Sequence, residues 1–388
     1  MKYDFDRVID RRGTSSFKWD NTDPDVLPLW VADMDFAVAP AITDALRKRI
    51  EHPIFGYVSV PDSYYQAVTD WFARRHHWEI DREWIIYTTG VVPAVSAIIK
   101  ALALPGEGVM MATPVYNCFY SSIRNDGCVA VEVPMVIDEQ GLYRMDFDAM
   151  EAAANRPDVK VFLLCNPHNP GGRIWTRDEL TRIGEICLKA GVTVISDEIH
   201  CEFTRPGDEY TPFATISTAF RDNCVSCISA SKAFNIAGLQ AANIVCADPM
   251  KRSRIDRVIN INEVCDLNPM GVVATQAAYN ESEDWLLALN DYIFANMDFL
   301  TAHFAQHLPH CRVMPLQGTY LAWIDIRSTG LTSDQCTARL LEQARVLVNS
   351  GSSYGAAGEG YIRINLACPR TTLATALTRI TPVLGIRH

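Results

Sequence analysis

The sequence has 388 residues, of which 48% are hydrophobic and 21% are charged. This composition is ordinary for a globular protein, and the length predicts two or three domains. The formal net charge of −11 argues against binding to nucleic acid or to an anionic membrane surface. No apolar run is long enough to span a bilayer, and charges stand where a signal peptide would need an apolar core, so we expect a cytoplasmic protein.

The first part of the chain predicts an arm followed by two helices. Residues 1–45, with the stretch WVADMDFAVAP, are expected to form an irregular arm. Helices are expected over 40–50 and 62–78, where apolar residues recur at helical spacing. The second helix ends in RRHHWE, residues 74–79, which we interpret as a solvated helix end.

Strands and helices alternate in the next part of the chain. Helices are expected over 91–103 and 176–191, the latter with a capping box, Thr176 with Glu179, and a stop at Gly191. Strands are expected at 83–90, 108–114, 128–134, 159–167, 192–198 and 223–230. Several of these strands are apolar throughout, which is typical of a parallel sheet covered on both faces. We therefore predict a large α/β domain over 46–280.

The pattern changes after residue 280. A long helical pattern over 284–308 leads to strand patterns at 319–326 and 359–368 and to two further helices. This arrangement predicts a smaller α+β domain over 281–388.

The cysteines and histidines give little indication of a metal site. The twelve cysteines are scattered through apolar segments, where cytosolic proteins use them as small buried hydrophobic residues. Cys224 and Cys227 form a CxxC pair, but on a strand they would point to opposite faces and would be poorly placed to share a metal ion. The nine histidines show no HExxH pattern, so we expect no metal.

Small and polar residues stand at or just after the ends of four of the predicted strands. They are Gly90 in TTGVVP, Asn169 in CNPHNPGG, Asp197 and His200 in SDEIH, and Ser229, Ser231 and Lys232 in SASK. Ligands of parallel sheets bind beyond the carboxyl ends of the strands. The N–H groups of Val91 and Val92, which begin the helix after Gly90, would suit a phosphate. Taken one at a time, each of these residues is more often an ordinary turn, cap or surface residue.

Taken together, these residues would satisfy the polar groups of pyridoxal 5′-phosphate. Lys232, a lysine among apolar neighbours, would form the Schiff base, because its amine must be partly neutral to react. Asp197 would pair with the pyridinium nitrogen and make the ring an electron sink. Asn169 would hydrogen-bond the phenolic oxygen. The phosphate would be held by Gly90, Val91, Val92, Ser229 and Ser231.

These motifs resemble the aspartate-aminotransferase superfamily, fold type I of the pyridoxal-phosphate enzymes. NPHNPGG is followed by SDEIH, with Asp197 28 residues after Asn169, and by SxxK, with Lys232 35 residues after Asp197. The resemblance implies a large domain with a mostly parallel seven-stranded sheet between helices, together with the smaller α+β domain. In YIRINLACPR it implies that Arg363 binds the substrate α-carboxylate, for which a planar guanidinium is suited.

The same resemblance assigns roles to two tyrosines. TPVYNCF places Tyr116 where the family stacks an aromatic ring on the cofactor, close to the substrate. FGYVSVP places Tyr57 where a tyrosine reaches the phosphate of the neighbouring subunit, which implies a homodimer with shared active sites. By themselves, both tyrosines would more often be simple packing residues.

Within the superfamily, the sequence is most similar to the MalY/PatB-type cystathionine β-lyases, also called C–S lyases. This resemblance is carried by WVADMDFA, FGYVSVP, LLCNPHNPGGRIWTRDEL, VISDEIH and SKAFNIAGLQ. His200 stands where many aminotransferases have a tyrosine, and Gln240, eight residues after Lys232, stands where many have an arginine on the phosphate. His200 could still bond the phenolic oxygen, either as a neutral donor or as a cation.

The resemblance to C–S lyases implies α,β-elimination of L-cystathionine or related L-cysteine S-conjugates. The products would be a thiol (homocysteine from cystathionine), pyruvate and ammonia, with Lys232 removing the Cα proton as general base. Two alternatives stay open: an aminotransferase that uses the same lysine, and a regulatory protein that keeps the fold. The sequence does not separate lyase from aminotransferase, because both reactions begin with the same carbanion.

Overall fold

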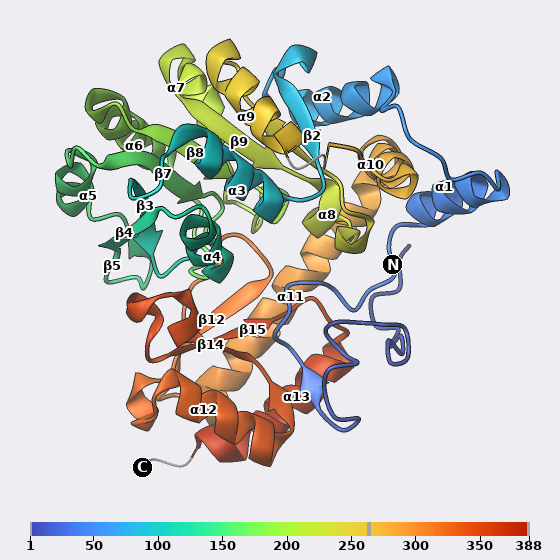
Figure 1. Ribbon diagram of the computed structural model, residues 1–388. Coiled ribbons are helices and arrows are strands. Elements are labelled where there is room, and N and C mark those ends of the chain that lie inside the picture. Colours follow the sequence, from blue (N-terminus) through green and yellow to red (C-terminus); the bar gives the residue numbers. More distant parts are fainter. Residues whose placement is uncertain (1, 262–264, 386–388) are drawn as a thin grey trace.

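A seven-stranded sheet forms the centre of the larger part of the molecule in the computed structural model, which describes residues 2–261 and 265–385 (Figure 1). Its strands are Ile85–Thr88 (β2), Gly108–Thr113 (β3), Val129–Pro134 (β4), Val159–Cys165 (β7), Thr193–Asp197 (β8), Cys224–Ile228 (β9) and Ala242–Val245 (β10). They lie in the order β2, β10, β9, β8, β7, β3, β4. All are parallel except β10, which runs antiparallel to β2 and β9. The predicted mostly parallel seven-stranded sheet is therefore confirmed.

Helices cover both faces of this sheet (Figure 1). They are Val91–Leu102 (α3), Asn117–Asn125 (α4), Phe147–Ala154 (α5), Arg177–Ala190 (α6), Thr218–Asp222 (α7) and Pro249–Ile261 (α9). Met110 and Ala112 of β3 pack in the layer of α5 and α6, whereas Val109 and Met111 pack in the layer of α3 and α9. Since alternate side chains of a strand point to opposite faces, burial of both faces explains why these strands are apolar throughout.

The ends of α6 follow the signals in the sequence. Thr176 Oγ1 accepts a hydrogen bond from the N–H of Glu179 at 3.2 Å, and the Glu179 carboxylate accepts one from the N–H of Thr176 at 2.8 Å. Gly191 ends the helix with a φ of +70°, a conformation that glycine adopts without steric cost. The predicted capping box and helix stop are both confirmed.

A four-stranded antiparallel sheet forms the second part of the molecule. Its strands are Arg312–Val313 (β11), Leu321–Asp325 (β12), Asn349–Ser350 (β14) and Tyr361–Asn365 (β15). Its helices are Glu283–His307 (α11), Ser333–Arg339 (α12) and Arg370–Leu384 (α13). Helix α11 runs from the larger part into the smaller one (Figure 1) and contributes side chains to the hydrophobic cores of both. The domain boundaries 1–45, 46–280 and 281–388 stay a prediction.

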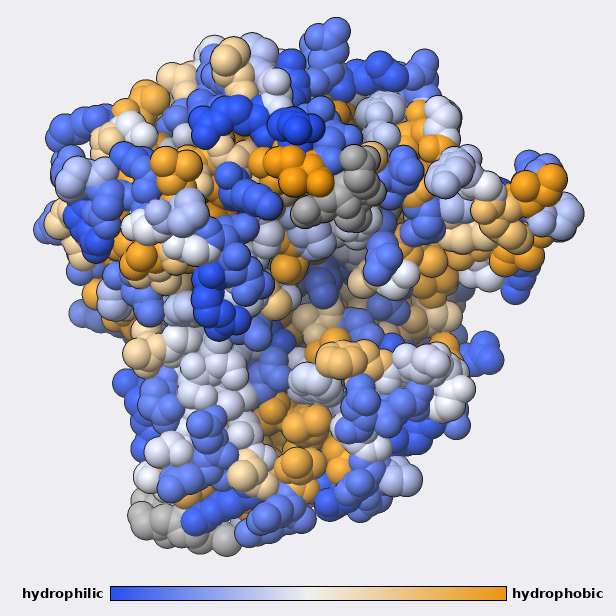
Figure 2. Space-filling view, in the orientation of Figure 1, coloured by the Kyte–Doolittle hydropathy of each residue, from blue (hydrophilic) through white to orange (hydrophobic). Residues whose placement is uncertain are grey.

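The N-terminal arm joins both parts of the molecule. Its strand Leu27–Pro28 (β1) pairs with Val346–Leu347 (β13), and the helices Pro40–Glu51 (α1) and Asp62–His76 (α2) that follow it pack on Pro269–Glu281 (α10). Helix α1 projects from the side of the molecule, and hydrophobic atoms gather on this projecting part (Figures 1 and 2). Further short elements include Val136–Ile137 (β5), Tyr143–Arg144 (β6) and Ala230–Ala233 (α8). None of the helices in the described ranges is both long and apolar enough to cross a membrane.

The two cysteines of the CxxC pair pack on opposite faces of β9. Cys224 belongs to the hydrophobic layer that contains α6, and Cys227 to the layer that contains α3. Both thiols are free and buried. The predicted orientation of this pair is therefore confirmed.

The prediction of a solvated helix end over 74–79 holds for Arg74, His77 and Glu79, which are exposed, but it is wrong for His76. His76 Nε2 donates to Glu202 Oε1 at 2.7 Å, and the same oxygen accepts from Trp71 Nε1 at 2.6 Å. Arg75 lies 3.5 Å from the other carboxylate oxygen, and the Glu202 side chain is only 3% exposed. Although Cys201 Sγ is also near, the Glu202 carboxylate is already engaged by N–H donors, so these residues form an ion-pair network. Its buried carboxylate comes from 126 residues further along the chain, where no local pattern of α2 could indicate it.

We expect Glu202→Ala to lower the free energy of unfolding by about 3–5 kcal/mol, because it removes the carboxylate from a buried ion-pair network. Glu283→Ala is the matched control, since Glu283 pairs with Arg75 at a more exposed position and should contribute about 0–1 kcal/mol. Urea unfolding followed by circular dichroism measures both, and equal losses in the two variants would contradict the prediction.

The same network predicts a pH dependence of stability. Burial raises the pKa of Glu202, but His76, Arg75 and Trp71 outweigh it and leave the pKa below its ordinary value. The carboxylate therefore stabilises the native state above the pKa of the unfolded chain, and this contribution is lost as the pH falls through the lowered native pKa. Wild type should accordingly lose part of its advantage over Glu202→Ala in acid.

Candidate active site

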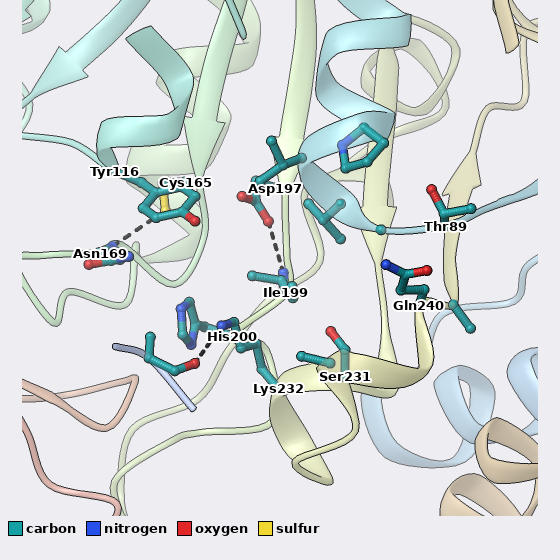
Figure 3. A pocket seen from close by; sticks show the side chains of 17 residues that line it. Thr89, Tyr116, Cys165, Asn169, Asp197, Ile199, His200, Ser231, Lys232 and Gln240 are labelled. Carbon is teal, nitrogen blue, oxygen red and sulfur yellow. Dashed lines mark hydrogen bonds between the residues drawn. The ribbon is translucent and has the colours of Figure 1, made fainter. Parts of the chain in front are cut away.

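A cavity of about 210 Å³ opens at the carboxyl ends of β7 and β8, beside the N-termini of α3 and α8 (Figure 3). The register of the sheet explains its position, because Cys165 of β7 pairs with Asp197 of β8, and Asp197 with Cys227 of β9. The turns that follow these strands thus meet at one edge of the sheet. The lining residues are Ala32, Thr89, Gly90, Val91, Val92, Pro93, Tyr116, Cys165, Asn169, Asp197, Ile199, His200, Ser231, Lys232, Ala237, Gln240 and Ala241.

One end of the cavity is built from neutral hydrogen-bond donors. Residues 90–92 line it at the start of α3, where the first N–H groups of a helix have no partner within the helix. Ser231, Thr89 and Gln240 lie together near this end (Figure 3). Lys232 is the only cation among the described lining residues. An anion at this end would therefore be held mainly by helix N–H groups and hydroxyl groups.

Ser229 lies outside the lining of the cavity. Its Oγ donates to the carbonyl of Ala241 at 2.7 Å and accepts from the N–H of Ser231 at 3.0 Å, so that it caps α8. Of the two serines predicted to bind phosphate, only Ser231 lines the cavity.

Asp197 is a buried carboxylate at the end of β8. Its side chain is 3% exposed, and Oδ1 accepts from the N–H of Ile199 at 3.1 Å. Burial raises the pKa of Asp197 to about 7, against the opposing effect of that hydrogen bond and of Lys232. A cationic ring nitrogen bound beside Asp197 would restore the charged form, because an opposite charge favours ionisation.

Lys232 faces the cavity from α8. Burial lowers the pKa of its amine to about 8. Nζ donates to the carbonyl of Ala32 at 2.5 Å (Figure 3). A substantial fraction of the amine is therefore neutral near pH 8, as a nucleophile or general base requires.

His200 lies beside Lys232 in the cavity (Figure 3). Burial lowers the pKa of His200 well below its ordinary value, and the nearby cations Lys232 and Arg363 act in the same direction. Its Nδ1 is buried and has no hydrogen-bond partner among the described residues. Of the two forms left open by the sequence, the neutral imidazole is therefore the one that the site favours.

Arg363 adjoins the cavity through Asn169. Nη1 donates to Asn169 Oδ1 at 3.0 Å, Nη2 donates to the carbonyl of Trp30 at 2.9 Å, and the guanidinium lies 5.0 Å from the ring centre of Tyr354. Within residues 2–261 and 265–385, no carboxylate pairs with Arg363, although its side chain is only 3% exposed. A buried cation without a counter-ion is suited to bind an anionic group of a ligand.

The comparisons with known proteins agree with this geometry. The sequence pattern of the family described as aminotransferase class I and II matches residues 24–380. The chain belongs to this family. The curated relative cystathionine β-lyase PatB of Bacillus subtilis is 40% identical to this chain and aligns with 98% of it and with 100% of its own length. Protein MalY of Escherichia coli is 32% identical, with 96% of each chain aligned.

A solved structure of the same aminotransferase-like fold is also similar over the full length. Cystalysin from Treponema denticola, described as containing a pyridoxal 5′-phosphate cofactor, superimposes with a TM-score of 0.96 at 33% identity, and 99% of both chains is covered. The fold class predicted from the motifs is confirmed, as is the resemblance to the MalY/PatB branch of this family.

The two tyrosines assigned by the family resemblance lie in different surroundings. Tyr116, at the start of α4, lines the cavity and packs against Phe119 at 5.7 Å between ring centres. Burial raises the pKa of Tyr116 far above its ordinary value, so its hydroxyl stays protonated. Tyr57 is fully exposed and lies outside the lining, on the segment after α1. Within a single chain the structure therefore brings Tyr116, but not Tyr57, to the site.

In this member of the aminotransferase family, backbone groups of the arm complete the site, and side-chain patterns did not reveal them. The carbonyl of Ala32 accepts hydrogen bonds from Lys232 and from the hydroxyl of Tyr320, the latter at 2.8 Å. The carbonyl of Trp30 accepts from Arg363. A carbonyl contact leaves no mark on residue type, so nothing in the sequence indicated this role for the stretch WVADMDFA.

Proposed function

We propose that this chain is a pyridoxal-phosphate-dependent C–S β-lyase. It cleaves L-cystathionine or related L-cysteine S-conjugates by α,β-elimination to a thiol, pyruvate and ammonia. The observation that carries the proposal is the gathering of a partly neutral amine, Lys232, and a buried carboxylate, Asp197, at the edge of the large sheet, with the unpaired cation Arg363 of the small sheet beside them. The 40% identity to cystathionine β-lyase PatB over the full length supports the same activity.

The residues of the cavity fit the cofactor. Buried polar atoms in proteins almost always have partners, and the unpartnered Nδ1 of His200 therefore indicates room for a further polar group. The set of donors and acceptors also matches the cofactor in number and kind. The proposed partners are residues 90–92 and Ser231 for the phosphate, Asp197 for the ring nitrogen, Asn169 and His200 for the phenolic oxygen, Tyr116 for the ring face and Lys232 for the aldehyde.

The chemistry assigned to the chain follows from these positions. Pyridoxal phosphate, when bound, supplies an electron-withdrawing ring that stabilises negative charge at the substrate Cα. Arg363 binds the substrate carboxylate. Its guanidinium donates hydrogen bonds to two neutral oxygens, those of Asn169 and Trp30, so its positive charge is available to pair with that carboxylate. The neutral amine of Lys232 accepts the Cα proton. Burial of both groups excludes water and strengthens each interaction with charge.

Two observations favour a lyase over the aminotransferase alternative, which shares the same base. Gln240, not a cation, lines the phosphate end of the cavity, and a neutral His200 stands beside Lys232. Gln240 and His200 both belong to the motifs, SKAFNIAGLQ and VISDEIH, that resemble the C–S lyase branch. The regulatory alternative is less well supported, because a scaffold has no need of an amine with a lowered pKa beside an unpaired guanidinium.

We expect the purified protein with pyridoxal phosphate to release pyruvate from L-cystathionine without any added keto acid. The elimination splits the Cβ–S bond, so no amino acceptor is needed to complete a turnover. Pyruvate is measured with lactate dehydrogenase across L-cystathionine, L-cystine and S-alkyl-L-cysteines, and free thiol is measured in parallel. Strict dependence on a keto acid would instead support the aminotransferase, and a stable complex with a transcription regulator in place of turnover would support the regulatory protein.

The assembly and location of the protein belong to the same proposal. We propose a homodimer with shared active sites, supported by the apolar side chains exposed on and after α1, namely Ile50, Ile54, Phe55 and Tyr57. In such a dimer Tyr57 reaches the phosphate of the neighbouring subunit. The twelve free cysteines support a cytoplasmic location, because reducing compartments keep thiols free.

A further inference from the structure

The N-terminal arm is hydrogen-bonded to both cationic side chains of the site. Lys232 Nζ donates to the Ala32 carbonyl at 2.5 Å, and the Tyr320 hydroxyl donates to the same oxygen at 2.8 Å. Arg363 Nη2 donates to the Trp30 carbonyl at 2.9 Å. The backbone of the arm is therefore part of the wall against which the Lys232 amine rests.

A cluster of four charged side chains holds this part of the arm in place. Arg11 pairs with Asp33 and with Asp35, both at 2.7 Å. Lys18, which is completely buried, lies 2.8 Å from Asp35 and 3.7 Å from Asp33. Trp19 Nε1 adds a hydrogen bond of 2.8 Å to Asp35. Two cations thus balance two anions, and removal of any one of them leaves a partner without compensation.

Among the charged groups around Lys232, Asp33 has the largest effect on the amine. Burial lowers the pKa of Lys232 to about 8, and Asp33 opposes burial by raising it. The other groups that face the amine are Arg363 on β15, Asp197 and neutral His200 in and after β8, and Cys118 on α4. Asp33 in turn faces Arg11 and Lys18 within the cluster and Tyr320 beside it.

We propose that Asp33 is a positioning residue. Together with Arg11, it holds the Ala32 carbonyl against Lys232 and determines the electrostatic potential at the Lys232 amine. The inference rests on the proposed function of Lys232 as the base. The Asp33 carboxylate is already engaged by Arg11 and Lys18, so Asp33 and Arg11 act through Lys232 and the arm, not on the substrate. Asp33 favours the ammonium form of the lysine, and Arg11 offsets part of that effect.

Two substitutions in this cluster are expected to have opposite effects on Lys232. Asp33→Asn removes the carboxylate that favours the ammonium form, so the amine should lose its proton at lower pH. Arg11→Gln leaves the charge of Asp33 less compensated, so the amine should keep its proton to higher pH. A loosened arm would by itself change the burial of Lys232 in the same direction in both variants, and opposite signs therefore separate the electrostatic role from a purely structural one.

The test is the pH dependence of the acetylation of Lys232 by acetic anhydride in the full-length chain freed of cofactor. Mass spectrometry gives the extent of labelling, with exposed Lys160 as internal standard. The midpoint should fall in Asp33→Asn and rise in Arg11→Gln. Asp25→Asn is the matched control, since Asp25 is an exposed aspartate of the same arm that pairs with Arg345 outside the cluster, and its midpoint should stay at the wild-type value.

Shifts of the same sign in Asp33→Asn and Arg11→Gln, or no shift in either, would overturn the proposal. If Asp33→Asn does not fold, a missing rise in Arg11→Gln overturns it equally. The labelling needs no substrate, so its outcome is independent of whether the protein proves to be a lyase. In the loaded enzyme, the acid limb of the kcat profile should move in the same directions, because Lys232 must be neutral to accept the proton.

Discussion

Lys232→Ala is expected to reduce pyruvate formation from L-cystathionine by about 10²- to 10⁴-fold, because the variant lacks the group that accepts the Cα proton. The amine has no substitute at this place, since Lys232 is the only cation among the described residues that line the cavity. The visible absorption of the cofactor bound through this lysine should be lost as well. Turnover measured by pyruvate release and absorption spectra of the dialysed protein check the two effects.

The control for this variant is Lys160→Ala. Lys160 is an exposed lysine of β7, away from the cavity, and its replacement should leave both turnover and the cofactor spectrum unchanged. The fold of Lys232→Ala should be intact by circular dichroism, because removing a buried amine relieves the cost of burying it. Normal turnover in Lys232→Ala would refute the assignment of the base.

Arg363→Leu is expected to lower kcat/KM for L-cystathionine by about 30- to 5,000-fold, which corresponds to about 2–5 kcal/mol. The cost is this large because the substrate carboxylate would enter a buried site without its counter-ion. Most of the loss should appear in KM if the arginine binds substrate and transition state equally, and in kcat if it also aligns the Cα–H bond. Steady-state kinetics with L-cystathionine measure both constants.

Arg327→Leu is the matched control for Arg363→Leu. Arg327 follows β12 in the same small sheet region, pairs with Asp325 and has a side chain that is 63% exposed, so kcat/KM should be unchanged. Arg363→Lys should recover only part of the lost activity, because an ammonium group cannot replace the two parallel hydrogen bonds of a guanidinium. Equal kinetics for Arg363→Leu and wild type would exclude Arg363 from the carboxylate site.

Much of the fold could be read from local patterns in the sequence. Apolar runs such as 159–165 predicted strands buried on both faces, and Thr176, Glu179 and Gly191 predicted both ends of α6. These features depend on residues only a few positions apart in the sequence. Their interactions therefore do not depend on how the rest of the chain folds. The antiparallel strand β10 was not predicted, because two of its four residues, Ala242 and Asn243, have low strand propensity.

The candidate site likewise has features that the sequence predicted and features that it did not. The residue types at 169, 197 and 232 could be recognised from their positions after predicted strands and from their spacing. The sequence did not indicate that Ser229 would cap α8 from outside the cavity. It also did not indicate that His76 would form a hydrogen bond with the buried carboxylate of Glu202. Both contacts depend on which elements become neighbours in space.

The sequence by itself determined which chemical groups are available and where they stand along the chain: a carboxylate at Asp197, an amine at Lys232 and a guanidinium at Arg363. The tertiary structure alone decided their charge states and partners. The pairing of Asp197 with Cys165 and Cys227 brings the turns together, and the arm adds the Ala32 carbonyl and the charge of Asp33. Burial and Coulomb energy depend on distances through space, and distances between residues far apart in the chain exist only once it has folded.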